Sequence, residues 1–273
     1  GIIIAKEKET VHILTTTKAI KNGSPNVVFD NGVRVTSTII GDDADSGLAV
    51  IQVTTNFEVK PFTILDTNAL AQGANVVVMS GRNLTTGSAV VSSGITSEPG
   101  VWRMSSTTTW LSSMLEMDTP ITSIQEGGAV IDLNGSLVGV VASQPYQGNS
   151  RMEYAITANE IKLIYNAIKS NGKVMRGALG VVVRNVSSMF AYEKSAHGIN
   201  IDMKSGLFVQ TVIEKMDTED GLQEGDIITM IDGIEMTSYQ DVLARLYMHS
   251  AGDTVNVSII RGGESKQIGV VLQ

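Results

Sequence analysis

Short runs of β-branched residues, separated by turn-forming residues, fill the first 160 positions of the chain. Val, Ile and Thr fit a pleated, half-buried surface, whereas Gly, Asn, Asp and Ser favour tight turns. Many short strands at this spacing predict a β-sandwich or a β-barrel. The runs are GIIIAKE, TVHILTTT, NVVFD, RVTSTIIG, LAVIQV, NVVVMSG, SAVVSSGITS and SLVGVVAS.

A helix is predicted where this pattern stops, in the segment TANEIKLIYNAIKSNG. Ile161, Ile164 and Ile168 recur there at helical spacing, and Gly172 is typical of a helix C-terminus. We expect this helix to close a first domain.

The pattern changes after a short linker at 171–176. Strands are predicted at 178–186 and 206–215. An Asp-Gly hairpin turn, a helix that begins near Ser238 and a closing hairpin around a Gly-Gly pair follow them. The chain is therefore expected to hold two domains.

The composition excludes several kinds of site. The 273 residues include no cysteine, which excludes disulfides, thiolate catalysis and cysteine-based zinc sites. The formal net charge is −8 at pH 7, and Lys and Arg form no cluster of the kind that binds nucleic acid. His, Asp and Glu do not recur at metal-ligand spacing. We predict no cofactor, no metal site and no nucleic-acid partner.

The start of the sequence bears on location. No apolar run reaches the length of a membrane-spanning helix, and nothing resembles a signal peptide. The sequence opens on GIIIAKE, which is typical of the interior of a strand. We expect the natural chain to begin earlier, with an N-terminal anchor as its only link to a membrane.

The segment 177–273 resembles a PDZ domain of the kind attached to HtrA proteases. The phrases RGALGVVV, GLFVQTVIEKM, GLQEGDIITMIDGIEM and AGDTVNVSIIRGG carry the resemblance. The family implies that extended C-termini or unfolded segments bind by strand addition between a strand and a helix. The apolar residues concerned would equally suit a plain hydrophobic core. Carried over, the peptide-binding residues are Ala178, Leu179, Gly180, Val181, Val183, Val242 and Leu246.

Residues 1–170 resemble the HtrA protease domain. GIIIAKEKETVHILTTTKAI is similar to the family's segment ending T-N-x-H-V, and GDDADSGLAVIQV is similar to its G-x-D-x-x-x-D-L-A-V. LEMDTPITSIQEGGAVIDLNGSLVGV is similar to the segment around its G-N-S-G-G-P. RMEYAITANEIKLI is similar to the family's entry into the last helix of this domain. The resemblance implies a mainly β protein, a trypsin-like double six-stranded β-barrel followed by an α+β PDZ domain.

The positions of the family's catalytic triad hold other residue types. In the family, serine attacks the scissile carbonyl, histidine takes its proton and aspartate orients the histidine. Lys18 stands at the histidine position, Gly47 at the aspartate position and Glu126 at the serine position. Ile124 stands where a glycine N–H helps to form the oxyanion hole. We therefore predict no catalytic residues, a chain that is not an enzyme, and an ion pair between Lys18 and Glu126.

The alternative is an active serine-type endopeptidase with a non-standard nucleophile and base. Burial can lower a lysine pKa and make the amine a base, so Lys18 could serve in a Ser–Lys arrangement. Ser123 is the nearest serine in the sequence, although it lies before the turn. His12, His197 and His249 have no carboxylate companion pattern.

The resemblance implies a function in peptide binding. We expect a catalytically inactive HtrA-like protein that binds peptide C-termini or unfolded segments through its PDZ domain. It would act as a scaffold, sensor or regulator in protein quality control, with an active HtrA relative among its partners. The family further implies a bacterial, extracytoplasmic, membrane-anchored homotrimer. A purely structural module with a closed groove is the remaining alternative.

Overall fold

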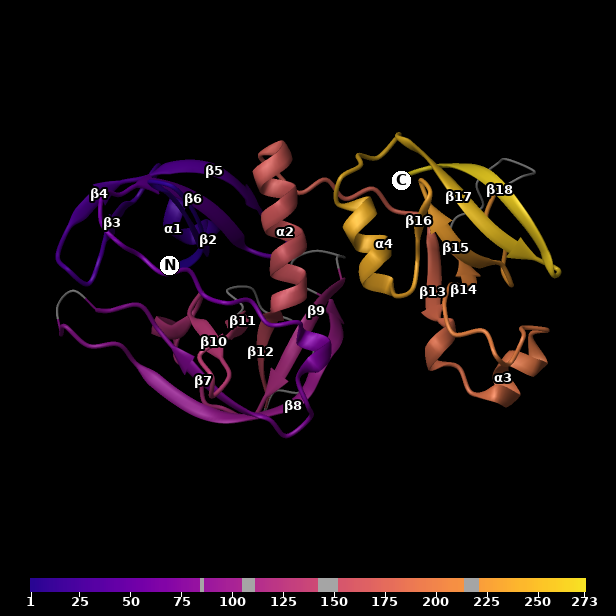
Figure 1. Ribbon diagram of the computed structural model, residues 1–273, viewed down its shortest axis with the longest axis horizontal. Coiled ribbons are helices and arrows are strands. Elements are labelled where there is room, and N and C mark those ends of the chain that lie inside the picture. Colours follow the sequence, from indigo (N-terminus) through magenta and orange to yellow (C-terminus); the bar gives the residue numbers. More distant parts are fainter. Residues whose placement is uncertain (84–85, 105–110, 142–151, 214–220) are drawn as a thin grey trace. The chain divides into compact units, whose positions relative to one another are not determined.

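The computed structural model describes residues 1–273 apart from 84–85, 105–110, 142–151 and 214–220 (Figure 1). The ends of two predicted strands, at 142–143 and 214–215, lie outside the described residues. The chain divides into two compact units, Gly1–Val174 and Met175–Gln273. Each unit has its own apolar core.

The first half of the first unit is built from antiparallel strands. Its elements are β1 (Ile2–Glu7), β2 (Thr10–Thr16), α1 (Thr17–Ile20), β3 (Asn26–Val28), β4 (Arg34–Thr36), β5 (Thr38–Asp43) and β6 (Leu48–Thr54). Four strands form a sheet in the order β1-β2-β6-β5, and β3 pairs with β4. Val11, Ile13, Ile51 and Val53 are buried together, because β2 and β6 carry apolar runs on adjacent strands.

The second half of the first unit is a closed six-stranded barrel. Its elements are η1 (Thr67–Ala69), β7 (Asn75–Met79), β8 (Val91–Met104), β9 (Leu111–Met117), η2 (Ser123–Gln125), β10 (Ala129–Ile131), β11 (Leu137–Val141) and β12 (Glu153–Thr157). The order is β10-β11-β12-β9-β8-β7, and Val130 of β10 lies opposite Val78 of β7, which closes the barrel. Val78, Leu115 and Val130 fill its interior. The predicted mainly β fold is confirmed.

The predicted helix is α2 (Ala158–Asn171), which closes the first unit. The Thr157 hydroxyl accepts the N–H of Glu160 at the N-terminus, 3.3 Å away. Gly172 ends the helix in a left-handed conformation with φ 74°, which glycine adopts without a Cβ clash. Ile161 and Ile164 are fully buried on the inner face.

The second unit is a twisted antiparallel sheet with two short helices (Figure 1). Its elements are β13 (Val181–Asn185), η3 (Val186–Ser188), α3 (Ala191–Ala196), β14 (Leu207–Val212), β15 (Ile227–Ile231), β16 (Ile234–Glu235), α4 (Tyr239–Leu246), β17 (Thr254–Arg261) and β18 (Glu264–Val271). The strand order is β13-β14-β15-β17-β18, with β16 paired to β15. β13 and β18 are therefore the edge strands at the two ends of this order.

Two hairpin turns of this unit follow from their glycines. Asp232 and Gly233 both have positive φ, 50° and 76°, which is the geometry of the Asp-Gly turn that the sequence predicts. Gly262 and Gly263 turn the chain in the same way between β17 and β18. None of the helices in the described part of the chain has the length and hydrophobicity needed to span a bilayer.

Candidate functional site

The three triad positions lie together in the first unit. Lys18 is in α1, and its Nζ donates a hydrogen bond to Oε2 of Glu126 over 2.6 Å. Gly47 joins them through the backbone, because its carbonyl accepts the N–H of Thr17 at 2.9 Å. The predicted ion pair between Lys18 and Glu126 is confirmed. It is open to water, since the side chains are 61% and 36% exposed.

The turn before Glu126 is closed by its own backbone. The Glu126 N–H donates to the carbonyl of Ser123 at 3.3 Å, and the N–H of Gly128 donates to the carbonyl of Gln125 at 2.8 Å. Ile124, at the predicted oxyanion position, lies inside η2 with 46% of its surface exposed. The N–H groups of Glu126 and Gly128 therefore already have acceptors within the turn.

The Gly-Gly pair is required by packing as well as by backbone conformation. A Cβ on Gly128 would lie 2.5 Å from the carbonyl oxygen of Met79 and 2.7 Å from that of Gln125. Gly127 has φ 69°, and its Cβ would lie 2.5 Å from Cγ2 of Thr16. The pair lets this turn lie directly against β7 and the end of β2.

Gln125 anchors the same turn, and the sequence reasoning missed it. Its side chain is buried, with 1% of the residue exposed. Oε1 accepts the N–H of Thr122 at 3.1 Å, and Nε2 donates to the Val78 carbonyl at 3.3 Å and to Ser92 Oγ at 3.0 Å. The spacing Thr-x-x-Gln is a capping-box signature that could have revealed it.

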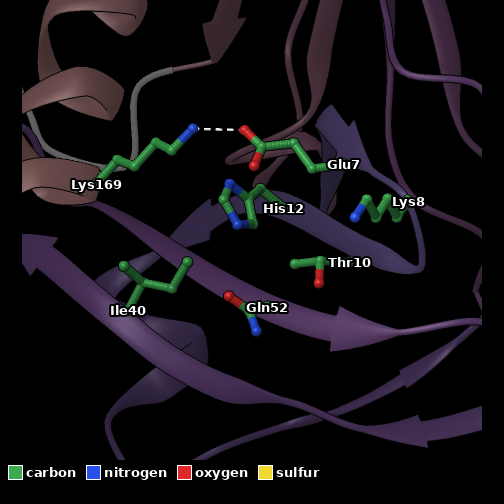
Figure 2. Close-up of a pocket in the computed structure, with 7 residues that line it drawn as sticks. All are labelled: Glu7, Lys8, Thr10, His12, Ile40, Gln52 and Lys169. Atoms are coloured by element: carbon green, nitrogen blue, oxygen red, sulfur yellow. Dashed lines mark hydrogen bonds and ion pairs between the residues drawn. The ribbon is translucent and has the colours of Figure 1, made fainter.

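A hollow of about 530 Å³ in the first unit is lined mostly by polar residues, His12 among them (Figure 2). His12 is buried, and its Nδ1 lies 2.6 Å from the hydroxyl oxygen of Tyr165. Burial lowers the pKa of His12, and the positive charge of Lys169 lowers it further. Lys169 donates to Glu7 at 2.5 Å across the hollow. No sequence pattern marks this hollow, because Tyr165 lies 153 positions from His12 in the chain.

The predicted carboxylate-binding loop begins the second unit's sheet. Ala178 and Gln273 donate their N–H groups to each other's carbonyls, at 3.0 and 2.9 Å. Leu179 is buried in the core. Gly180 has φ 68°, and its carbonyl accepts the N–H of Ile213 at 2.8 Å. The left-handed glycine turns the backbone just before β13, as a loop that presents N–H groups would require.

The other predicted peptide-binding residues lie in one apolar cluster. Val242 and Leu246 on α4 are 1% and 5% exposed. Val181 and Val183 on β13 are partly buried against the same cluster. The Asn185 side chain accepts the N–H of Tyr239 at 3.0 Å and so ties β13 to the start of α4. The structure thus brings β13 and α4 together, with the helix side the more deeply buried.

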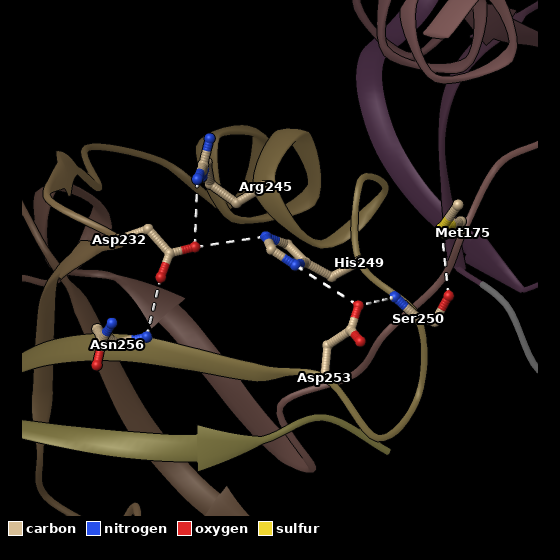
Figure 3. Close-up of polar contacts among 7 residues, drawn as sticks. All are labelled: Met175, Asp232, Arg245, His249, Ser250, Asp253 and Asn256. Carbon is tan, nitrogen blue, oxygen red and sulfur yellow. Dashed lines mark hydrogen bonds and ion pairs between the residues drawn. The ribbon is translucent and has the colours of Figure 1, made fainter. Parts of the chain in front are cut away.

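His249 lies between two carboxylates in the second unit (Figure 3). Its Nε2 is 3.4 Å from Asp232, and its Nδ1 is 3.8 Å from Asp253. Arg245 donates to Asp232 at 3.2 Å. The cluster lies at the hairpin turn and the end of α4, so it links these two elements. Across the described residues, no three His, Asp or Glu side chains are placed to hold a metal ion.

Comparison with family models identifies both units. Residues 1–140 match the model described as a trypsin-like peptidase domain, and residues 177–272 match the PDZ domain model. The chain belongs to the trypsin-like peptidase family. Its second unit is a PDZ domain, and together the two give this peptidase-family chain an HtrA-like arrangement.

Curated relatives match the whole chain. This HtrA-like chain is 27% identical over 281 residues to "Serine protease Do-like HtrA" of Lactobacillus helveticus, covering 100% of itself and 68% of that protein. It is 27% identical over 285 residues to "Serine protease HtrA-like" of Staphylococcus aureus (strain USA300) and spans only 37% of that relative.

Solved structures share the fold. "HtrA-type protease AlgW with decapeptide" matches with a TM-score of 0.60 and 20% identity, covering 98% of this chain and 80% of the other. "HtrA-type protease AlgW with tripeptide" matches with a TM-score of 0.60 and 20% identity, covering 98% and 87%.

The prediction that this HtrA-like chain is not an enzyme is wrong on these comparisons. Relatives aligned over its full length are named serine proteases. The prediction rested on the residue types at Lys18, Gly47 and Glu126, and those residue types do not establish inactivity.

Proposed function

We propose that this chain binds extended polypeptide, through a free C-terminus, on the β13 edge of its PDZ domain. The observation that carries the proposal is that β13 is an edge strand beside α4, preceded by the left-handed turn at Gly180. An edge strand has backbone groups available for a further strand, and adjacent apolar side chains supply selectivity. Two of the similar structures are of AlgW with a decapeptide and with a tripeptide, which supports peptide binding as the use of this fold.

The apolar side of the proposed site selects the peptide's side chains. Val181 and Val183 retain partial exposure, whereas Val242 and Leu246 are almost fully buried. Backbone pairing with β13 then contributes most of the contact. We expect a preference for a small or branched apolar residue at the peptide's C-terminus, because Val242 and Leu246 are almost fully buried.

Fluorescence anisotropy with labelled decapeptides tests the proposal. Each sequence is made with a free C-terminal carboxylate and with a C-terminal amide, and the dissociation constants are compared. The proposal predicts that the carboxylate forms bind about tenfold or more tightly, as charge-assisted hydrogen bonds to backbone N–H groups are stronger than neutral ones. Equal affinity for the two forms, or no binding by any peptide, would overturn it.

A Gly180→Val variant provides the matched loss of function. A branched side chain resists φ 68°, and its Cβ would lie 2.9 Å from the Gln273 side chain. Carboxylate peptides are expected to bind it more weakly. Gly198→Val is the control, because Gly198 also has positive φ, 67°, but no neighbour within 4 Å.

The cellular role is proposed from the same family likeness. The bound polypeptide would be an unfolded protein or an active HtrA relative, and the chain would act outside the cytoplasm of a bacterium in protein quality control. Assembly as a homotrimer, with an N-terminal membrane anchor, belongs to the same proposal. Cell fractionation tests the location, and light scattering of the purified protein tests the trimer; a cytoplasmic monomer would contradict both.

Peptide hydrolysis is the second candidate function. It is favoured by the relatives named serine proteases, which align with the whole chain. Incubation with casein, read by mass spectrometry, tests it beside a Lys18→Ala variant. Cleavage that vanishes in the variant would support a lysine-assisted nucleophile. Absence of fragments in both would remove this candidate, and cleavage that survives in both would exclude Lys18 from the chemistry.

A further inference from the structure

A stacked aromatic pair is open to solvent beyond the end of β13. The rings of Phe190 and Tyr192 lie 5.9 Å apart between centroids, with planes 10° from parallel. The residues are 66% and 72% exposed. Exposed aromatic area of this kind marks an interaction surface more often than a single exposed apolar residue does.

The pair is held to β13 by a chain of hydrogen bonds. Arg184, on β13, donates from Nη1 to Oε1 of Glu193 at 2.8 Å and from Nη2 to the Ser188 carbonyl at 3.1 Å. Oε2 of Glu193 accepts the N–H of Phe190 at 2.8 Å. The hydrogen bond from Arg184 lowers the pKa of Glu193, so the carboxylate stays ionised at neutral pH. These bonds therefore tie the backbone of Phe190 to the strand.

The side chains on one face of β13 point away from the core, and the aromatic pair lies beyond the end of this strand. Side chains alternate between the two faces of a strand. Val183 packs against the core cluster, so Val182 and Arg184 face the opposite way, and Val182 is 44% exposed. α3, which follows Phe190, lies beyond the C-terminal end of β13 (Figure 1).

The direction of a bound peptide follows from the position of the loop. The Gly180 turn precedes β13, so a peptide with its carboxylate at that turn lies antiparallel to β13, and its upstream residues lie toward Asn185. β13 has five residues, Val181–Asn185. Five residues of an extended strand span about 17 Å at ~3.4 Å each. Only peptide residues upstream of the last five can reach Phe190 and Tyr192.

We propose that Phe190 and Tyr192 form a subsite for a large apolar or aromatic side chain upstream of the last five residues of the bound polypeptide. The inference rests on the proposed function and names its substrate class: C-terminal segments longer than five residues with an apolar residue upstream. Ring stacking supplies the contact for an aromatic side chain, because aromatic pairs gain interaction free energy beyond that of the area they bury.

Peptides of two lengths test the inference by anisotropy. One has five residues, and three decapeptides end in the same five. Counted back from the C-terminus, one decapeptide carries Phe as its sixth residue, one carries Phe as its seventh, and one carries Ser at both positions. A Phe decapeptide is expected to bind about three- to tenfold more tightly than the Ser decapeptide. A Phe190→Ser/Tyr192→Ser variant should lose that gain and bind the five-residue peptide as before.

The control is Val271→Ser on β18, a 44% exposed apolar residue at the opposite edge of the sheet. It should keep the gain. If the three decapeptides bind the parent and the Phe190→Ser/Tyr192→Ser variant with equal affinity, the subsite is overturned while the β13 site stands. If no peptide of either length binds, the proposed function itself fails. If the double variant unfolds in a thermal melt, Tyr192→Ser alone carries the same comparison, since that residue is 72% exposed.

Discussion

Lys18 and Glu126, 108 positions apart in the chain, form an ion pair over 2.6 Å at the two places where the family resemblance puts the catalytic histidine and serine. Both side chains remain open to water, at 61% and 36% exposure. The pair therefore links α1 to the turn that follows η2 without being part of a buried network.

This ion pair is expected to contribute little to folding. Exposed pairs typically couple by about 0.2–1 kcal/mol, because water screens them and two long side chains lose freedom. A double-mutant cycle with Lys18→Ala and Glu126→Ala should give a coupling in that range from denaturant unfolding. The coupling should shrink in 1 M salt, where the Debye length is about 3 Å. A coupling well above this range, insensitive to salt, would contradict the observed exposure.

Gly128→Ala should destabilise the first unit by about 1–3 kcal/mol. The added Cβ meets two backbone carbonyls, those of Met79 and Gln125, at 2.5 and 2.7 Å, and backbone cannot move aside cheaply. Gly81→Ala is the matched control, with nothing within 4 Å of its Cβ, and should stay within about 0.5 kcal/mol of the parent. Calorimetric unfolding of the three proteins checks this, and equal losses in both variants would refute the packing argument.

His12 should make the first unit less stable in mild acid. Burial, and then the charge of Lys169, lower the pKa of His12 below the ordinary value of 6.5, so the unfolded chain binds more protons there than the folded chain. The contribution of neutral His12 to stability is then fully present above about pH 6.5 and is lost as the pH falls through the folded-state pKa. His12→Gln should flatten the melting temperature between pH 7.5 and 5.5 relative to the parent.

The exposed His197 supplies the control for that experiment. His197→Gln removes a histidine from the second unit and should leave the slope of the first unit's transition unchanged. A parent protein whose first-unit transition is equally stable at both pH values would contradict the role of His12.

Asp232 should stabilise the folded PDZ unit through the bonds that its carboxylate oxygens accept. Burial alone would raise its pKa, but the N–H of Asn256 at 2.9 Å and the guanidinium of Arg245 lower it overall. Asp232→Ala loses these bonds and places alanine at φ 50°, at an expected cost of about 1–3 kcal/mol. Asp232→Asn keeps an acceptor and tolerates the left-handed turn, so it should lose less in urea unfolding. An Asn variant as damaged as the Ala variant would count against this account.

Local patterns predicted much of the fold. The β-branched runs predicted the strands, and the spacing of Ile161, Ile164 and Ile168 predicted α2. The Asp-Gly and Gly-Gly pairs predicted the hairpin turns. These signals depend only on neighbours in the sequence. The ion pair of Lys18 and Glu126 could be predicted as well, because the resemblance fixed which segments meet.

Contacts between distant segments could not be predicted in this way. His12 and Tyr165 are 153 positions apart, and no local pattern relates them. The burial of Val242 and Leu246 depends on how α4 packs onto the sheet, which helical spacing alone leaves open. α3 was missed, since its six residues are too short to show helical periodicity.

Hydrogen–deuterium exchange with a bound decapeptide tests the central claim most directly. A peptide with a free carboxylate should slow exchange at the amides of Val181–Asn185, which form the β13 edge. The amides of Glu264–Val271 form the other edge, β18, and should exchange at an unchanged rate. A bound peptide that protects β18, or that leaves β13 unprotected, would contradict strand addition at β13.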